Sequence, residues 1–290
     1  MIREKRFVFL LVLFIAIGFL TSCDAVTDAM EKVTDNINLF TDADEVKLGA
    51  DVVTEMKNNP AEYPIYTKNP AVKSYIKTRI FDQILSSSKI AKKNVFNYTL
   101  EIVNDDDVLN AFALPGGPVY LYTGLIKYLD SEAALAGVLG HEIGHAEESH
   151  AAERITKHYG VSIILGMILG ENPSELAQIA ANLFTGVAFL ANSRSDEDQS
   201  DLRSFEYLQD TRYYPGGVKF FFEKLRDDGL VSSGGGLEKY LSTHPDPVDR
   251  ISNTDARLQN AGITVYTYEN AVESAGIYRN EYKTNIVDQL

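Results

Sequence analysis

One segment narrows the folds open to this 290-residue chain: an alanine- and glycine-rich run that contains the motif His141-Glu142-x-x-His145. Asp130-Ser131, just ahead of the run, are typical helix-capping residues, so we expect one helix from there to about residue 158. At 100° per residue the two histidines project about 40° apart, and both imidazoles reach a single metal ion. The intervening glutamate lies at the edge of the same face, beside the position of a metal-bound water.

Two histidines do not complete a catalytic zinc site, which normally has three protein ligands and one open position. His150 lies about 140° round the expected helix from the second motif histidine, and His158 lies more than three turns along, so both are typical of solvated helix residues. Glu197 and Asp201 share a face of a helix predicted over 196–209, where they offer one ligand and one supporting carboxylate. On residue pattern alone, this acidic run is equally typical of a solvated helix start.

Three glycines, Gly137, Gly140 and Gly144, fall within about 60° of one another beside the histidine face. Each glycine inside a helix costs roughly 1 kcal/mol relative to alanine. We therefore expect another helix or strand to pack closely against this stripe.

The rest of the chain predicts short helices and a few short strands, with no internal repeat. Helices are expected over roughly 44–57, 70–86, from 172 onward, 196–209 and 216–226. The segment 98–103 alternates apolar and polar residues and predicts a strand with one wet face. Segments 110–114 and 119–123 flank a Pro-Gly-Gly-Pro turn, which predicts a hairpin and an edge strand. The uncharged stretch 176–193 contains enough amides to favour a buried or groove-covering helix over a membrane span.

The first residues indicate an export signal. A basic start leads into a 14-residue apolar segment at 7–20, which is too short for a membrane-spanning helix and is typical of a signal peptide. Residues 20–23 resemble a bacterial lipobox, so the only cysteine, Cys23, is expected to carry a lipid anchor that tethers the protein to a membrane. An ordinary signal peptide is the alternative. We expect a signal peptide at 1–22 and a membrane-proximal spacer at 23–43.

The charge balance bears on possible partners. With 41 acidic against 27 basic side chains the formal net charge is -14, which disfavours attraction to phosphate backbones. We therefore expect no nucleic-acid partner. The single cysteine also excludes an intramolecular disulfide.

Four separated blocks resemble one family, the HtpX-like and BepA/LoiP-like zinc metallopeptidases of the gluzincin type. The blocks are the motif at 141–145, the Ser-Arg-x-x-Glu-x-x-x-Asp run at 193–201, the hairpin at 110–120, and 242–245 with the arginine at 250. The resemblance covers roughly residues 40–255. Two positions depart from the family pattern, since Ser200 and Ser204 stand where alanine and glycine are usual.

The resemblance implies a fold and a domain layout. The fold class is α+β, mainly helical, with a zincin-type metalloprotease domain and a small antiparallel sheet whose edge strand faces the active-site cleft. The metallopeptidase domain is expected over 44–255, and a C-terminal extension over 256–290 has no predicted role.

The resemblance also implies a site with one Zn²⁺ per chain. His141, His145 and Glu197 are its expected ligands, and Asp201 is the expected partner of a ligating histidine. His244 is expected either to stabilise the oxyanion or to occupy the fourth zinc position, although a purely structural role beside Pro245 stays open. Arg250 is expected either to stabilise the oxyanion or to have a structural role. The ligand types also tolerate cobalt or manganese.

Substrate is expected to bind as an extended strand added to the sheet, which makes main-chain hydrogen bonds and gives loose sequence selectivity. The residues expected to contact it are Asn110, Ala111, Val119, Tyr120, Leu121 and Tyr122.

In the expected reaction, zinc lowers the pKa of its bound water towards about 7 and Glu142 acts as general base. Together with export, these features favour an endopeptidase of the bacterial cell envelope, outside the cytoplasm, that degrades misfolded or unassembled proteins. A zinc-containing chaperone or assembly factor is the competing hypothesis. An inactive lipoprotein is a third, but the motif is intact.

Overall fold

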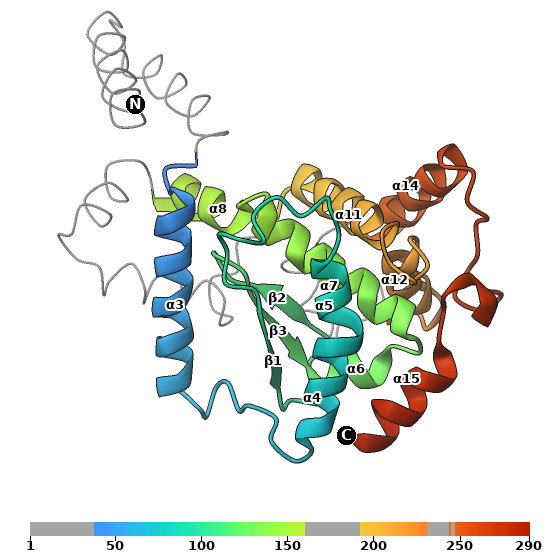
Figure 1. Ribbon diagram of the computed structural model, residues 1–290, viewed down its shortest axis with the longest axis horizontal. Helices are drawn as coiled ribbons and strands as arrows, with labels where there is room; N and C mark the ends of the chain where they lie inside the picture. The colour runs from blue at the N-terminus through green and yellow to red at the C-terminus, as the bar shows by residue number, and fades with distance from the viewer. Residues whose placement is uncertain (1–37, 160–191, 231–243, 245–246) are drawn as a thin grey trace, which may run out of the picture.

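Figure 1 shows the computed structural model of the chain, which describes residues 38–159, 192–230, 244 and 247–290. A small sheet lies at its centre with helices on both faces (Figure 1). Alternate residues of the strands divide between two apolar clusters, as the period-two geometry of a strand requires. The sheet is therefore a buried layer between two layers of helices.

The sheet contains β1 (Thr99–Val103), β2 (Ala111–Ala113) and β3 (Pro118–Tyr122) in the order β1-β3-β2. The hairpin of β2 and β3 is antiparallel, as expected, but β1 pairs parallel to β3, with Thr99 opposite Pro118. The sheet is thus mixed rather than wholly antiparallel. All five residues of β3 are buried. The strand has a neighbouring strand at each edge and helices over both faces of the sheet.

One face of the sheet packs on α3 (Asp42–Asn58), which begins with a capping box between Thr41 and Asp44. Leu48, Val52 and Met56 of this helix join the cluster that contains Phe112, Tyr120 and Tyr122. The helix predicted over 44–57 is confirmed, two residues longer at its start.

The other face packs on α7 (Glu132–Glu147) and, at β1, on the helix predicted over 70–86. The latter helix is continuous but contains a π-helical turn, in the order α4 (Pro70–Ile76), η1 (Lys77–Phe81) and α5 (Asp82–Leu85). Asn69 caps it by accepting a hydrogen bond from the Ala71 amide at 3.1 Å, and Pro70 occupies the first turn.

A short helix α6 (Thr123–Tyr128) leads to α7 (Glu132–Glu147), the helix that carries the histidine motif. Ser131 caps α7 as expected, with its hydroxyl accepting from the Ala134 amide at 3.3 Å. The prediction of one helix to residue 158 is wrong. Ser149 adopts a left-handed backbone (φ 62°), which interrupts the helix, and α8 (His150–Tyr159) begins at the next residue.

The glycine stripe of α7 packs against α11 (Arg194–Leu208) and α12 (Gly217–Asp227), which confirms the expected close approach. A Cβ at Gly137 would lie 2.1 Å from the Val218 amide of α12, and one at Gly140 would lie 2.8 Å from the Ser204 hydroxyl of α11. The Ser204 hydroxyl donates to the Gly137 carbonyl at 2.7 Å. Ser204 is one of the two departures from the family pattern. It fits because Gly140, which has no side chain, lies opposite it.

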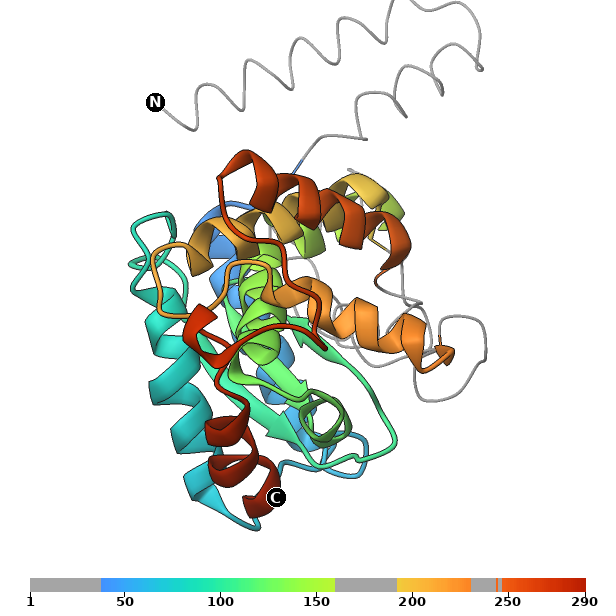
Figure 2. The same cartoon turned by 90° about the vertical axis from the view of Figure 1, so that its right-hand side faces the viewer.

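After α14 (Pro247–Asn260) the chain runs back across the molecule to end beside α4 (Figure 2). It forms η3 (Glu273–Ala275), α15 (Arg279–Asn285) and η4 (Val287–Gln289). The Ala133 amide at the start of α7 donates to the Ile277 carbonyl at 3.1 Å, and Tyr282 donates to the Ile126 carbonyl at 2.6 Å. The extension, which had no predicted role, is thus packed against the start of the motif-bearing helix.

Several predictions lie outside the described residues: the signal peptide, the lipidation of Cys23, the helix from 172 onward and its groove-covering role. The division into a spacer, a domain and an extension also stays a prediction. Within the described part of the chain, every helix is too short or too polar to cross a bilayer.

Candidate metal centre

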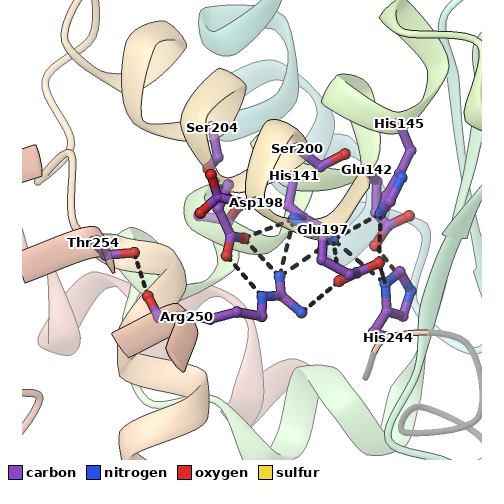
Figure 3. Close-up of polar contacts among 12 residues, drawn as sticks. His141, Glu142, His145, Glu197, Asp198, Ser200, Ser204, His244, Arg250 and Thr254 are labelled. Carbon is purple, nitrogen blue, oxygen red and sulfur yellow. Dashed lines mark hydrogen bonds and ion pairs between the residues drawn. The ribbon is translucent and has the colours of Figure 1, made fainter. Parts of the chain in front are cut away.

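Four buried side chains converge at one point: His141 and His145 from α7, Glu197 from α11, and His244 from the segment before α14 (Figure 3). One potential ligand atom from each residue lies within 4.8 Å of the corresponding atoms of the other three. The structure thus brings together all three predicted zinc ligands and the predicted fourth histidine.

The distances fit a small cation with nitrogen and oxygen ligands. The Nε2 atoms of His141 and His145 lie 2.9 Å apart, and the Glu197 carboxylate is 3.5 Å and 3.3 Å from them. His244 Nδ1 lies 3.0 Å from Glu197 Oε1. The Nδ1 atoms of both motif histidines have other partners, so each ring directs Nε2 to the common point. Imidazole nitrogens with a carboxylate are a zinc-type donor set.

The local sequence explains why Glu197 is in place. Ser193 and Asp196 form a capping box at the start of α11, with amide-to-side-chain bonds of 3.0 and 3.1 Å. The cap places Glu197 in the first turn, and the glycine–serine contact between α7 and α11 holds this turn against the two histidines. Asp201 follows one turn later and accepts from His141 Nδ1 at 2.8 Å.

Arg250 of α14 binds the carboxylates behind the ligands. Its Nε and Nη2 donate to the two Asp201 oxygens at 2.7 and 2.6 Å, and its Nη1 lies 2.6 Å from Glu197 Oε2. This contact favours the structural role among the two predicted for Arg250, since the guanidinium binds Asp201 and faces the carboxylate of Glu197 (Figure 3).

Burial and charge shift the pKa values of these groups in opposite directions. Burial and Arg250 act to lower the pKa of His141, but Asp201 and Glu197 outweigh them and raise it to about 9. Burial, with the charge of His141, lowers the pKa of His145 well below its ordinary value. Burial acts to raise the pKa of Glu197, but His244 and Arg250 hold it well below the usual range. The site is therefore a coupled set of charges.

Glu142 is suited to proton transfer. It is 1% exposed, and its Oε1 is buried without a hydrogen-bond partner among the described residues, with His244 Nε2 at 3.8 Å. A buried carboxylate oxygen with no donor is costly unless a ligand or substrate group occupies the space beside it.

Two further residues at the site were not predicted to be there. His150, expected to be solvated, is 2% exposed and its Nδ1 lies 2.8 Å from His145 Nδ1. That expectation is wrong because the chain turns at Ser149 and no longer follows the 100° spacing. Asn192 donates to Glu197 Oε1 at 2.5 Å. Its position directly before the capping serine was the only signal in the sequence.

The predicted substrate strand requires a correction. Val119, Tyr120, Leu121 and Tyr122 lie on β3, whose backbone pairs with β1 on one side and β2 on the other. Addition of a peptide strand to this segment is therefore excluded. The outer strand next to α7 is β2, which starts at Ala111 (Figure 1).

Asn110, directly before β2, is fully buried, and in the described part of the chain neither its Oδ1 nor its Nδ2 has a hydrogen-bond partner. Its backbone carbonyl accepts from the Tyr122 amide at 3.1 Å. The predicted contacts of Asn110 and Ala111 with substrate stay predictions.

A helix with two histidines and a buried glutamate, a carboxylate from a second helix and a supporting aspartate define the class of protein as a metallopeptidase. Residues 70–258, well over half of the chain, match the family model described as peptidase family M48. The chain belongs to this family, which confirms the resemblance drawn from the four sequence blocks.

Curated relatives agree with this assignment. The chain is 26% identical to the beta-barrel assembly-enhancing protease of Escherichia coli (strain K12) over 294 residues, or 95% of this chain and 57% of the relative. It is 35% identical to the mitochondrial metalloendopeptidase OMA1 of Arabidopsis thaliana over 144 residues, or 50% of this chain and 28% of the relative. The Schizosaccharomyces pombe protein of the same name is 24% identical over 90% of this chain and 75% of its own length. The chain thus spans less than two thirds of the first two relatives.

Proposed function

We propose that the chain is a zinc-dependent endopeptidase of the bacterial cell envelope that hydrolyses peptide bonds of misfolded or unassembled proteins. The observation that carries the proposal is the buried ligand set of His141, His145 and Glu197 beside Glu142, whose Oε1 accepts no hydrogen bond from the described residues. This combination places a Lewis-acid site next to a proton acceptor, which amide hydrolysis at neutral pH requires.

In this proposal His141, His145 and Glu197 would hold a zinc ion, which would supply Lewis acidity to a peptide carbonyl and to a water molecule. Glu142 accepts the proton of the water at Oε1 and returns it to the leaving amine. His244, whose Nε2 faces Glu142 at 3.8 Å, donates a hydrogen bond to the developing oxyanion. Asp201 and Arg250 keep His141 and Glu197 in orientation.

The substrate is proposed to be an unfolded stretch of polypeptide. An extended peptide is proposed to pair, through main-chain hydrogen bonds, with the outer edge of β2, which has no strand partner among the described residues and lies next to the motif-bearing helix. Such binding favours substrates that are locally unfolded and depends less on their particular sequence. The name of the Escherichia coli relative, a beta-barrel assembly-enhancing protease, supports envelope proteins as the substrate class.

The location is proposed from the sequence start. A signal peptide at 1–22 and a lipid anchor on Cys23 place the catalytic domain outside the cytoplasm, tethered to a membrane.

The deciding experiment compares the detergent-solubilised full chain with Glu142→Gln and with Glu55→Gln, an exposed control on α3. We expect one zinc per chain in all three by elemental analysis, and casein cleavage reduced at least 100-fold only by Glu142→Gln. A parent without zinc would refute the metal assignment, and full cleavage by Glu142→Gln would refute its role as base.

The position of His244 gives some support to a second candidate function. This residue is the fourth nitrogen or oxygen donor of the cluster, and a site closed by four protein ligands is typical of structural rather than catalytic zinc. A chaperone or assembly factor that retains zinc fits that arrangement. Undiminished binding of unfolded outer-membrane protein by Glu142→Gln, without casein cleavage by the parent, would favour it.

A further inference from the structure

The turn at Ser149 brings a third histidine of this region into contact with a ligand. The residue has a left-handed backbone although it is not glycine, a conformation that costs energy and often marks a functional constraint. The Lys92 ammonium donates to its hydroxyl at 2.8 Å, which holds the turn in place. The result is that His150, the first residue of α8, faces back toward His145, with ring centroids 5.0 Å apart.

The hydrogen bonds around His150 settle where its proton lies. The Glu148 carboxylate accepts only, so its 2.6 Å contact with Gln199 makes the Gln199 Nε2 group the donor. The other amide atom, Gln199 Oε1, then faces His150 Nε2 at 3.3 Å and must accept its proton. Neutral His150 therefore carries its proton on Nε2 and leaves Nδ1 as an acceptor.

The contact between the two rings also determines which nitrogen of His145 carries the proton. Because His150 Nδ1 is an acceptor, the 2.8 Å contact requires His145 Nδ1 to donate. A neutral imidazole with its proton on Nδ1 has its lone pair on Nε2, the atom that faces His141, Glu197 and the common ligand point. The chain of contacts from Glu148 through Gln199 and His150 thus selects the tautomer of His145 that a metal requires.

The two motif histidines reach this tautomer by different means. His141 donates to a carboxylate, Asp201, whereas His145 donates to an uncharged imidazole. The second arrangement orients the ligand without adding negative charge to a site that already contains Glu197 and Asp201.

We propose that His150 is a positioning residue for the metal centre: it accepts the Nδ1 proton of His145 and thereby holds His145 Nε2 toward the metal. This role rests on the metal site of the proposed function and deepens it. It concerns the orientation of a ligand, because His150 contacts His145 and is not one of the four side chains that converge at the centre.

The test compares three substitutions in the full chain. His150→Leu removes the acceptor, His150→Gln keeps an acceptor oxygen, and Lys157→Ala is an exposed control on the same helix. Loss of a partner behind a ligand typically weakens metal binding about 10–100-fold. We expect that loss for His150→Leu in zinc competition with a chromophoric chelator, and recovery to within about threefold of the parent for His150→Gln. Lys157→Ala is expected to match the parent.

A second readout does not need zinc. With only 5 histidines in the chain, ¹⁵N-histidine spectra can be assigned by substitution, and the nitrogen shifts report which ring nitrogen carries the proton. In the metal-free parent we expect His145 protonated on Nδ1, and in His150→Leu a change toward Nε2. Circular dichroism confirms that each variant is folded.

The outcomes separate the two proposals. A parent that binds no zinc refutes the proposed function, while its nitrogen shifts still test the role of His150. Equal zinc affinity for folded His150→Leu and the parent, or His145 protonated on Nε2 in the parent, overturns the inference. Should His150→Leu fail to fold, a His150→Gln variant with zinc affinity weakened as much as tenfold overturns it as well.

Discussion

At the scale of single residues, the centre depends on polar groups whose roles are set by their neighbours. Asp201 forms a 2.8 Å hydrogen bond with Nδ1 of His141, and His150 forms one of the same length with Nδ1 of His145. Both motif histidines therefore direct Nε2 toward the centre. Arg250 binds Asp201 through both carboxylate oxygens, which ties α14 to the centre. The geometry of the ligands is therefore maintained from three helices, and α7 alone does not determine it.

A buried carboxyl away from the centre gives a pH-dependent prediction. Glu45 on α3 is 1% exposed, and burial raises its pKa above the ordinary value of 4.5. Because the folded state binds this proton more tightly, the contribution of Glu45 to stability is complete below pH 4.5 and is lost as the pH rises through the raised pKa.

We therefore expect Glu45→Gln to increase stability relative to the parent at about pH 7, and this advantage to shrink at about pH 4. Urea unfolding of the metal-free protein at the two pH values measures it. Glu55→Gln, exposed on the same helix, is the control. An advantage for Glu45→Gln that grows on acidification would contradict the expectation.

At the scale of elements, the contact between α7 and α11 determines whether ligands from two helices meet. Gly140 lies so close to Ser204 that a Cβ there would be 2.8 Å from its hydroxyl and 3.2 Å from its Cα. No rotation of the serine side chain relieves the contact with Cα. The two helices would have to move apart to accept a larger residue.

Gly140→Ala is therefore expected to lower the free energy of unfolding by about 1–3 kcal/mol, despite the better helix propensity of alanine. Adding Ser204→Gly, which opens space opposite, should recover part of that loss, so the two changes are not additive. Denaturant unfolding of both single variants and the double variant tests this. Additive effects would show that the close approach is not the cause.

At the scale of the whole molecule, residues beyond the matched family region complete the fold. The first amides of a helix lack partners within the helix, and the Ala133 amide of α7 donates instead to the Ile277 carbonyl at 3.1 Å. The Tyr282 hydroxyl, on a side chain that is 1% exposed, donates to the Ile126 carbonyl. The C-terminal segment thus stabilises the start of the helix that carries the motif.

Tyr282→Phe is expected to lower the free energy of unfolding by about 1 kcal/mol, since it removes one buried hydrogen bond and little apolar surface. Tyr268→Phe is the matched control, because that hydroxyl makes an exposed contact with the adjacent Glu269, at 3.5 Å. Thermal unfolding of both variants is the measurement. Equal stability of the two would mean that the Tyr282 bond contributes nothing.

The local sequence determined much of the architecture. The caps at Ser131 and Ser193, the hairpin turn and the spacing of His141 and His145 depend on residues within one or two turns of each other. Such short-range interactions form in any context that allows a helix or a hairpin, so their patterns are visible in the chain itself. The motif, Glu197 and Asp201 were located in this way together with the family resemblance.

Only the tertiary structure decided the rest. The parallel pairing of β1, the turn that brings His150 to His145, and the placement of Arg250 on Asp201 each join residues distant in sequence or separated by an irregular backbone. Local propensities do not encode these contacts, because their free energy comes from packing and burial that exist only when the whole chain has folded. For the same reason the C-terminal segment, which lacks a strong local pattern, acquires its position from the helix start that it covers.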